Sequence, residues 1–298
     1  MRKAMTWLVR VAGALVLALI LALGVIYGIS QRRMSAKYTI TPPVPKVSAD
    51  PGAVLRGEHV ATIRGCRGCH GPNLAGETFI DAPLVARLSG ANLTPGRVGG
   101  APSDVDMVRA IRHGVAGDGR PLLFMPAQEL SALSGQDMGD LLAYLHSVPA
   151  VSHEPPENRV GPLGRLLFLT GKIPLLPAEL VDHQQQVPEF APSAPVAYGA
   201  YLAETCSGCH GRGFSGGPIP GTPPGWTVPA NLTPHATGLA GWSKDDLKRA
   251  LRDGVARGGR KLNTARMPVA MTRQLTDPEI SALYAYFRSL PAKPWGQR

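Results

Sequence analysis

The sequence predicts an all-α protein with two tandem helical domains behind one N-terminal transmembrane helix. Three observations support this prediction. Residues 11–29 form an unbroken apolar run that is long enough to cross a bilayer as a helix. A stretch of about a hundred residues then occurs twice in the chain. Within each copy the apolar residues recur at helical spacing, and no convincing alternation typical of a strand is visible.

The N-terminal region, residues 1–36, is predicted to be a membrane anchor whose helix covers about 7–29. A cleaved signal peptide is the alternative, because residues 28–30 would pass as a cleavage site with small residues on either side. The apolar run is longer than the roughly 7–15 residues usual for a signal peptide. Arg32 and Arg33 follow the run after two polar residues and flank it as a membrane stop. We therefore favour a retained anchor.

The repeat sets the domain boundaries. Asn-Leu-Thr-Pro at 92–95 recurs at 231–234, the segment 103–119 recurs at 243–259, and an Ala-Tyr pair recurs near the end of each copy. The predicted parts are the anchor at 1–36, a Pro-rich spacer at 37–51, a first domain at 52–151, a Pro-rich linker at 152–196, a second domain at 197–292 and a tail at 293–298.

Each domain is expected to contain three main helices. The first helix, at 54–69 or 197–209, should end in a cysteine motif. The middle helix should begin at a serine cap, Ser103 or Ser243, and end at a glycine. The last helix has one apolar face in each copy, formed by Met138, Leu141, Leu142, Leu145 and Val148 or by Ile280, Leu283, Tyr284, Phe287 and Leu290.

The two Pro-rich segments should contain little regular structure. The spacer composition favours an extended, semi-rigid chain, which would lift the first domain off the membrane. The linker contains an apolar patch at 163–180, where Pro174 and Pro177 exclude a long regular helix. We interpret this patch as cover for one domain, and a loop that docks on a partner or a membrane is the alternative.

All four cysteines of the chain lie in two C-x-x-C-H motifs, which are typical of c-type haem attachment. Two thiols at this spacing can each form a thioether to one haem vinyl group, and the following histidine can bind the iron. The predicted haem-attaching residues are Cys66, Cys69, Cys206 and Cys209, and the predicted iron-binding histidines are His70 and His210. The expected cofactors are two covalently bound haem c groups.

Two other uses of these cysteines fit the sequence less well. One zinc ion would need two C-x-x-C pairs close together, and it would leave both following histidines unexplained. A thioredoxin-like redox pair would need an α/β pattern around it, and the sequence shows no such pattern.

Methionine is the usual second axial ligand beside histidine when an iron carries electrons. Met125 and Met267 each occupy a loop about 55–60 residues after a C-x-x-C-H motif, and each precedes a proline. They are therefore the predicted methionine ligands. Met271 is the rival in the second copy, where it aligns with Glu129. The histidines without an equivalent in the other copy are expected at surface or packing positions, and one of them as an axial ligand is the alternative: His59, His113, His146, His153, His183 and His235.

The formal net charge is +10, but the basic residues are scattered and no basic patch is interleaved with aromatic residues. Nucleic acid is therefore excluded as a partner, and a basic surface that docks an acidic redox protein is the milder inference. No proton-transfer dyad or activated nucleophile is visible. These features favour an electron-transfer protein over an enzyme.

These motifs resemble the class I cytochrome c domain, present twice: C-x-x-C-H, Asn-Leu-Thr-Pro, the R-x-G-V segments at 112–115 and 252–255, Met-Pro, and the Ala-Tyr pair of the last helix. More narrowly, the chain is similar to membrane-associated cytochrome c subunits that accept electrons from periplasmic dehydrogenases, such as alcohol and gluconate dehydrogenases.

The resemblance implies a relay of electrons from a dehydrogenase or other donor to a downstream respiratory acceptor. It also implies a single-pass protein of the bacterial inner membrane with both haem domains in the periplasm, because haem is joined to C-x-x-C-H outside the cytoplasm. A haem-bearing subunit of a terminal oxidase and a dihaem cytochrome c peroxidase are the alternatives.

Overall fold

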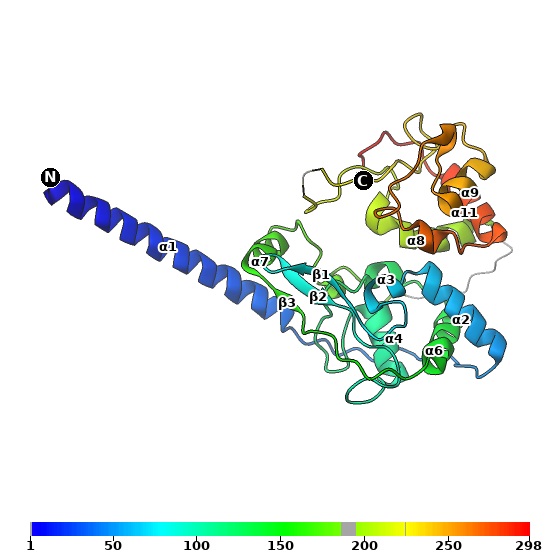
Figure 1. Ribbon diagram of the computed structural model, residues 1–298, viewed down its shortest axis with the longest axis horizontal. Helices are drawn as coiled ribbons and strands as arrows, with labels where there is room; N and C mark the ends of the chain where they lie inside the picture. The colour runs from blue at the N-terminus through cyan, green and yellow to red at the C-terminus, as the bar shows by residue number, and fades with distance from the viewer. Residues whose placement is uncertain (1, 186–194, 224) are drawn as a thin grey trace.

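A computed structural model describes residues 2–185, 195–223 and 225–298. A long helix, α1 (Arg2–Met34), projects from the rest of the molecule, and two helical units follow it (Figure 1). The first unit contains α2 (Pro51–Ile63), α3 (Arg67–His70), α4 (Asp104–His113), α5 (Ala127–Leu130) and α6 (Gly135–Ser147). The second unit contains α8 (Pro195–His210), α9 (Lys244–Asp253), α10 (Val269–Thr272) and α11 (Asp277–Ser289). The mostly helical class and the tandem arrangement agree with the sequence prediction.

Helix α1 is the one helix among the described residues that is long and apolar enough to cross a membrane, judged by length and composition. None of its most apolar segment is buried against the rest of the chain. The predicted helix at about 7–29 lies within it.

The helix ends follow the predicted capping residues. The Oγ atoms of Ser103 and Ser243 accept hydrogen bonds from the backbone N–H groups of Asp106 and Asp246, at 3.3 and 3.1 Å. Helices α4 and α9 both end at a left-handed glycine that comes directly after the last helical residue. Helix α11 begins with a capping box between Thr276 and Glu279.

In each unit the first helix packs against the last one, α2 on α6 and α8 on α11. Glycines make this close approach possible. A Cβ atom on Gly57 would collide with the backbone carbonyl of Asp140, and one on Gly199 would collide with that of Ala282. Cys66 lies nine residues after Gly57, whereas Cys206 lies seven residues after Gly199. The first unit therefore holds two extra residues between the packing glycine and the cysteine motif.

These extra residues explain a difference from the expected helix at 54–69. Helix α2 ends at Ile63, and α3 starts afresh at Arg67. Gly65 between them has a φ of +75°, a left-handed conformation that interrupts a helix and is most accessible to glycine. In the second unit the corresponding helix, α8, runs through Cys206 to His210 without a break.

A small antiparallel sheet, which the sequence analysis did not predict, lies beside the first unit. Its strand order is β1 (Thr78–Ala82), β2 (Ala86–Ser89) and β3 (Arg159–Val160). Strands of two to five residues are too short to show a clear alternation of apolar and polar side chains. Because β3 belongs to the predicted linker, the sheet ties that segment to the first unit.

The rest of the described linker also packs on the first unit. Helix α7 (Pro162–Leu169) and the short helix η1 (Pro177–Glu179) hold a buried apolar cluster of Phe168, Leu175 and Leu176. The expectation that the patch covers one domain is therefore confirmed for Phe168, Leu175 and Leu176, whereas Leu163, Leu166 and Leu180 stay exposed. The linker segment 186–194 lies outside the described part of the chain.

The spacer at 37–51 has no helix or strand before Pro51, as expected, but it does not lift the first unit away from α1. The N–H of Tyr38 donates to the carbonyl of Gly119 at 2.9 Å, and Arg109 Nε donates to the carbonyl of Ile40 at 2.6 Å. The segment instead runs along the surface of the first unit, because its backbone polar groups find partners there.

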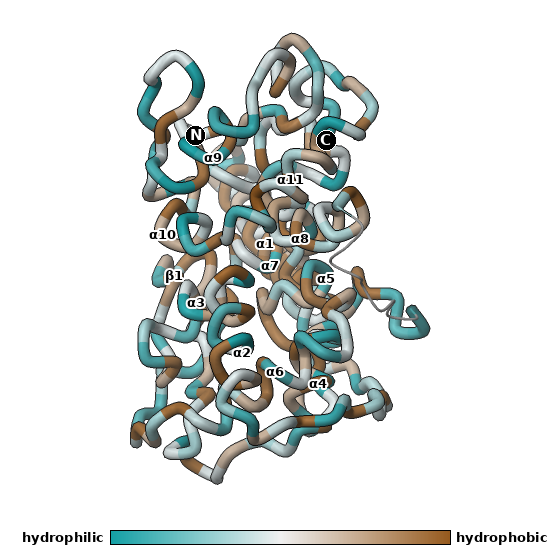
Figure 2. Tube along the Cα trace, turned by 90° about the vertical axis from the view of Figure 1, so that its right-hand side faces the viewer, coloured by the Kyte–Doolittle hydropathy of each residue, from teal (hydrophilic) through white to brown (hydrophobic). Residues whose placement is uncertain are grey.

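One cluster of buried apolar side chains runs through both units, from Val60 in α2 to Phe287 in α11. Figure 2 shows α2, α4 and α6 at one end of this arrangement, α9 and α11 at the other, and α5 and α10 between them. Helix α5 contacts α8, and α10 contacts α2, so the units meet through the short helices that follow Met125 and Met267.

We expect Gly57→Ala and Gly199→Ala each to lower the free energy of unfolding by about 1–3 kcal/mol, because the added methyl group forces the paired helices apart. Thermal unfolding followed by circular dichroism measures the loss. Gly68→Ala is the control, since no atom lies within 4 Å of a Cβ at that position. Unchanged melting temperatures for the two packing variants would contradict this account of helix pairing.

Candidate haem sites

The two C-x-x-C-H motifs place their histidines in the same environment. His70 ends α3 and is 9% exposed, and His210 ends α8 and is 8% exposed. The Nδ1 atom of His70 lies 2.7 Å from the carbonyl oxygen of Ala91, and Nδ1 of His210 lies 2.8 Å from that of Ala230. A carbonyl oxygen can only accept a hydrogen bond, so Nδ1 carries the hydrogen in both histidines. The Nε2 atom is then left with its lone pair available to a metal.

Burial keeps both imidazoles neutral. It lowers the pKa of His70 and of His210 below 6.5, although the hydrogen bonds to Ala91 and Ala230 act in the opposite direction. A nearby Arg298 lowers the pKa of His210 further. A neutral imidazole with a fixed tautomer is the form that binds iron. The histidines thus fit the predicted ligand role.

The repeated Asn-Leu-Thr-Pro string explains why these carbonyls are in place. Asn92 is 2% exposed, accepts a hydrogen bond from the N–H of Thr94 at 2.9 Å, and donates to the carbonyl of Val151 at 2.8 Å. Asn231 accepts from Thr233 at 2.9 Å and donates to the carbonyl of Lys293 at 2.7 Å. Each asparagine therefore fixes its loop. The residue just before the asparagine, Ala91 or Ala230, then presents its carbonyl to the histidine. The sequence showed this repeat but not its role.

The four cysteines form no disulfide with one another. Burial raises the pKa of Cys66 to about 11 and that of Cys206 to about 12, and it also raises the pKa of Cys69 and Cys209. Before haem is attached, such thiols stay protonated at neutral pH, unlike the low-pKa thiolates of redox-active cysteine pairs. No cluster of three or more His, Cys, Asp or Glu among the described residues could hold a metal ion. Both findings disfavour the thioredoxin-like and zinc alternatives.

Met125 and Met267 occupy identical turns. The φ and ψ angles are −77° and +55° for Pro126 and −75° and +67° for Pro268, close to those of an inverse γ-turn. Its closing hydrogen bond, 2.7 Å long in both units, joins the methionine carbonyl to the N–H of Ala127 or Val269. Both methionine side chains are partly buried against the core cluster, against which Cys66 and Cys206 also pack. Within each unit the cysteine motif and the Met-Pro turn thus border the same apolar core.

Met271 lies elsewhere. Its Sδ atom is 3.2 Å from the position that a Cβ atom on Gly65 would take, so it faces the first unit. The aligned residue of the first unit, Glu129, lies against the second unit in the same way, because a Cβ on Gly208 would collide with its carboxylate. Each cysteine motif therefore adjoins a side chain from the short helix that follows the other unit's Met-Pro turn.

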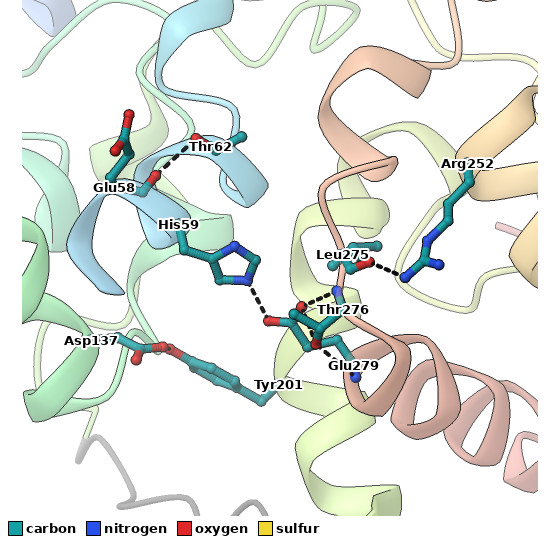
Figure 3. Close-up of polar contacts among 9 residues, drawn as sticks. All are labelled: Glu58, His59, Thr62, Asp137, Tyr201, Arg252, Leu275, Thr276 and Glu279. Carbon is teal, nitrogen blue, oxygen red and sulfur yellow. Dashed lines mark hydrogen bonds and ion pairs between the residues drawn. The ribbon is translucent and has the colours of Figure 1, made fainter. Parts of the chain in front are cut away.

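Polar contacts across the interface repeat the same geometry with different chemistry (Figure 3). His59 Nε2 in α2 lies 2.8 Å from Glu279 Oε1 in the first turn of α11. The hydroxyl of Tyr201 in α8 donates to the carboxylate of Asp137 in the first turn of α6. These two pairs occupy equivalent positions, so the two units are related by a pseudo-two-fold axis. Arg64 adds hydrogen bonds to the Tyr201 carbonyl and to Thr205 Oγ1, at 3.2 and 2.9 Å.

Two contacts near the sites had no sequence signal. Arg298 Nη1 donates to the carbonyls of Cys209 and Gly217, at 2.8 and 2.9 Å, so the predicted tail lies on the second cysteine motif. His59, expected to have a surface or packing role, packs at the interface through the contact described above. Among the other non-repeated histidines, His146 pairs with Asp104 and His113 contacts His183.

Comparison with known proteins assigns the family. Residues 52–145 match the family model of cytochrome c oxidase, cbb3-type, subunit III, and residues 196–291 match the model of cytochrome c. Together with the two sites, these matches show that the chain is a dihaem c-type cytochrome that carries two covalently bound haem c groups.

Relatives that align with most of the chain include cytochrome subunits of dehydrogenases. The chain is 29% identical over 284 residues to the cytochrome c subunit of alcohol dehydrogenase (quinone) of Gluconacetobacter polyoxogenes, an alignment that covers 84% of this chain and 58% of the relative. It is 30% identical over 284 residues to the gluconate 2-dehydrogenase cytochrome c subunit of Pantoea cypripedii, with 84% and 62% covered. It is 27% identical over 277 residues to a diheme cytochrome c-type protein of Cereibacter sphaeroides, with 81% and 87% covered. The chain thus spans less than two thirds of the length of these dehydrogenase subunits.

The His59–Glu279 pair makes stability depend on pH. Its hydrogen bond raises the pKa of His59 above 6.5, although burial opposes the shift. Burial acts to raise the pKa of Glu279, but hydrogen bonds from His59 and Thr276 bring it below 4.5. A raised histidine pKa stabilises the fold fully below pH 6.5, and this contribution is lost as pH rises through the folded pKa. We expect the melting temperature to fall over that range in the wild type, and His59→Gln to remove this part of the fall.

The control for this experiment is Tyr201→Phe, which breaks the equivalent pair without removing a group that titrates near neutral pH. Burial raises the pKa of Tyr201 above 10, so the variant should be less stable but keep the wild-type pH dependence. A His59→Gln profile that parallels the wild type would overturn the assignment.

Proposed function

We propose that the chain relays electrons from a dehydrogenase to a downstream respiratory acceptor, as the electron-transfer component of an oxidoreductase system and not as the catalyst of substrate oxidation. The arrangement of the two cysteine motifs at one pseudo-symmetric interface carries this proposal. Similarity to dehydrogenase cytochrome c subunits along most of the chain supports it.

Each unit supplies the groups that one haem c requires. We assign the thioether bonds to Cys66 and Cys69 in the first unit and to the corresponding cysteines, Cys206 and Cys209, in the second. The axial ligands in this assignment are His70 and Met125, and His210 and Met267. The observed donor set fits the group, because each histidine is neutral with Nδ1 tied to a carbonyl and each methionine is partly buried beside its cysteine motif.

A bound haem c supplies one-electron iron chemistry, and methionine ligation raises the reduction potential relative to a harder ligand. The chain's own residues orient the ligands and exclude water. Asn92 and Asn231 hold the loops that fix the imidazoles. The Met-Pro turns bring a sulfur to the core without interrupting a helix.

The interface suits transfer between the two sites. The residue before the first motif, Gly65, lies against Met271 of the second unit, and Gly208 inside the second motif lies against Glu129 of the first unit. An electron passing between the motifs need not cross water, because one apolar cluster is continuous through both units. We infer that an electron entering at one site reaches the other through this contact.

We further propose that α1 is a retained anchor in the bacterial inner membrane, with both haem units in the periplasm. Its length and apolar composition suit a single span, and Arg32 and Arg33 follow the apolar run. Because α1 is joined by specific side-chain contacts to the linker that packs on the first unit, such as the ion pair between Arg33 and Glu179 of η1, the anchor also supports the fold.

The methionine assignment tests the electron-transfer role directly, because an iron with both axial positions filled by the protein has no open face for substrate. We expect Met125→Ala and Met267→Ala each to remove about half of the methionine-to-iron absorption band of the oxidised protein, since each is assigned to one of the two haem groups. Met271→Leu is the matched control and should keep the whole band. Loss of the entire band from one substitution, or any loss from Met271→Leu, would contradict the assignment.

The same preparation separates an electron carrier from a dihaem peroxidase. Wild-type protein should not turn over hydrogen peroxide with a reduced cytochrome as the electron donor. Rapid turnover would favour the peroxidase and reject the proposed function.

A further inference from the structure

Helix α7 has an apolar face that the protein leaves uncovered. Gly164, Arg165 and Phe168 are buried on one side of the helix. On the other side Leu163 is 44% exposed and Leu166 is 42% exposed. Exposed leucines one turn apart on a short, fixed helix indicate a surface that contacts something apolar.

The neighbouring loop enlarges this face. The carbonyl of Leu84 accepts hydrogen bonds from the N–H groups of Leu163 and Gly164, at 3.0 and 3.3 Å, so Leu84 lies at the N-terminal end of α7. The Leu84 side chain is 69% exposed. We call Leu84, Pro162, Leu163 and Leu166 the apolar wedge.

The wedge is held firmly beside α1. Arg165 donates to Ser30 Oγ at 2.7 Å and to Gln31 Oε1 at 3.0 Å, and its guanidinium lies 4.1 Å from the centre of the Tyr27 ring. The Arg33 guanidinium lies 4.0 Å from the centre of the Phe168 ring. Figure 1 shows α7 next to the end of α1 from which the first unit begins.

The level of this contact along α1 places Pro162 of the wedge beside the proposed membrane-spanning segment. A groove of about 490 Å³ is lined by Leu23, Ile26 and Tyr27 of α1 and by Val160, Pro162 and Arg165. The apolar run of α1 ends at Ile29, six residues after Leu23, and a helix rises about 1.5 Å per residue. The groove therefore extends about 9 Å below the end of the run, within the roughly 5–10 Å to which interfacial helices enter a bilayer.

Exposed basic residues lie close in sequence to the wedge and to the end of the apolar run. Arg32 follows the run of α1, Lys172 follows α7, and Arg159, which pairs with Glu157 at 3.9 Å, precedes α7. An apolar face bordered by exposed arginine and lysine is typical of a helix that lies in a membrane interface.

We propose that the apolar wedge is a second membrane contact, with Leu84, Leu163 and Leu166 among the acyl chains of the leaflet nearest the haem units. The inference rests on the proposed anchoring of α1. One helix leaves a domain free to tilt, whereas two rigidly joined contacts fix the face that the first haem unit presents to its redox partners. A partner protein covering the wedge is the competing occupant, and the experiment distinguishes the two.

The test uses the full haem-loaded chain in lipid nanodiscs of phosphatidylethanolamine and phosphatidylglycerol. The native cysteines are bound to haem, so a single added cysteine in Leu166→Cys accepts a nitroxide label. Power-saturation EPR then compares collisions of the label with oxygen, which concentrates in lipid, and with a water-soluble nickel chelate. Leu21→Cys reports on α1 insertion, and Leu55→Cys, a 68% exposed leucine on α2 away from α1 (Figure 1), is the aqueous control.

We expect the oxygen-to-nickel collision ratio at positions 21 and 166 to exceed that at position 55 several-fold. A high ratio at 21 with an aqueous ratio at 166 would overturn the second contact while leaving the anchor intact, and would leave the wedge free for a protein partner. An aqueous ratio at 21 would reject the anchor and the wedge together.

Discussion

The hydrogen bond between a buried histidine Nδ1 and a backbone carbonyl is the constraint on which both sites depend. Ala91 and Ala230 supply the carbonyls, and these can only accept, so each imidazole keeps its hydrogen on Nδ1 and its Nε2 lone pair available. The carbonyls stay in place because a buried asparagine one residue further on closes its loop onto the chain after the last helix. The segment after the last helix of each unit thus helps to position the histidine near the start of that unit.

The second organising feature is the pseudo-two-fold contact between the units. Two equivalent pairs span the interface, His59 with Glu279 and Tyr201 with Asp137. The shared geometry keeps the cysteine motifs at one interface, whereas the different chemistry confines the near-neutral titration to the His59 pair. Glu129 adds an asymmetric charge: burial beside Glu204 raises its pKa to about 7, whereas the equivalent Met271 is uncharged. The two sites consequently have different electrostatic surroundings.

The sequence was sufficient for features that depend on repeated local chemistry. The caps at Ser103 and Ser243 and the capping box of α11 follow from residue type and spacing. Features that depend on contacts distant in sequence were not accessible. The break at Gly65 results from two extra residues whose effect depends on how α2 packs on α6, and the three strands are too short to show a pattern. Arg298 lies on the second motif only because the chain folds back there. The assignments of the axial methionines and the domain boundaries stay predictions.

The central claim is that the two haem sites form one electron path across the interface. Rapid injection of one electron per molecule, followed by absorption spectroscopy of the two haems, tests this claim most directly. We expect the electron to redistribute between the sites with a rate that does not depend on protein concentration, because the transfer occurs within one chain. A redistribution rate proportional to protein concentration would show that electrons pass only between molecules and would contradict the account.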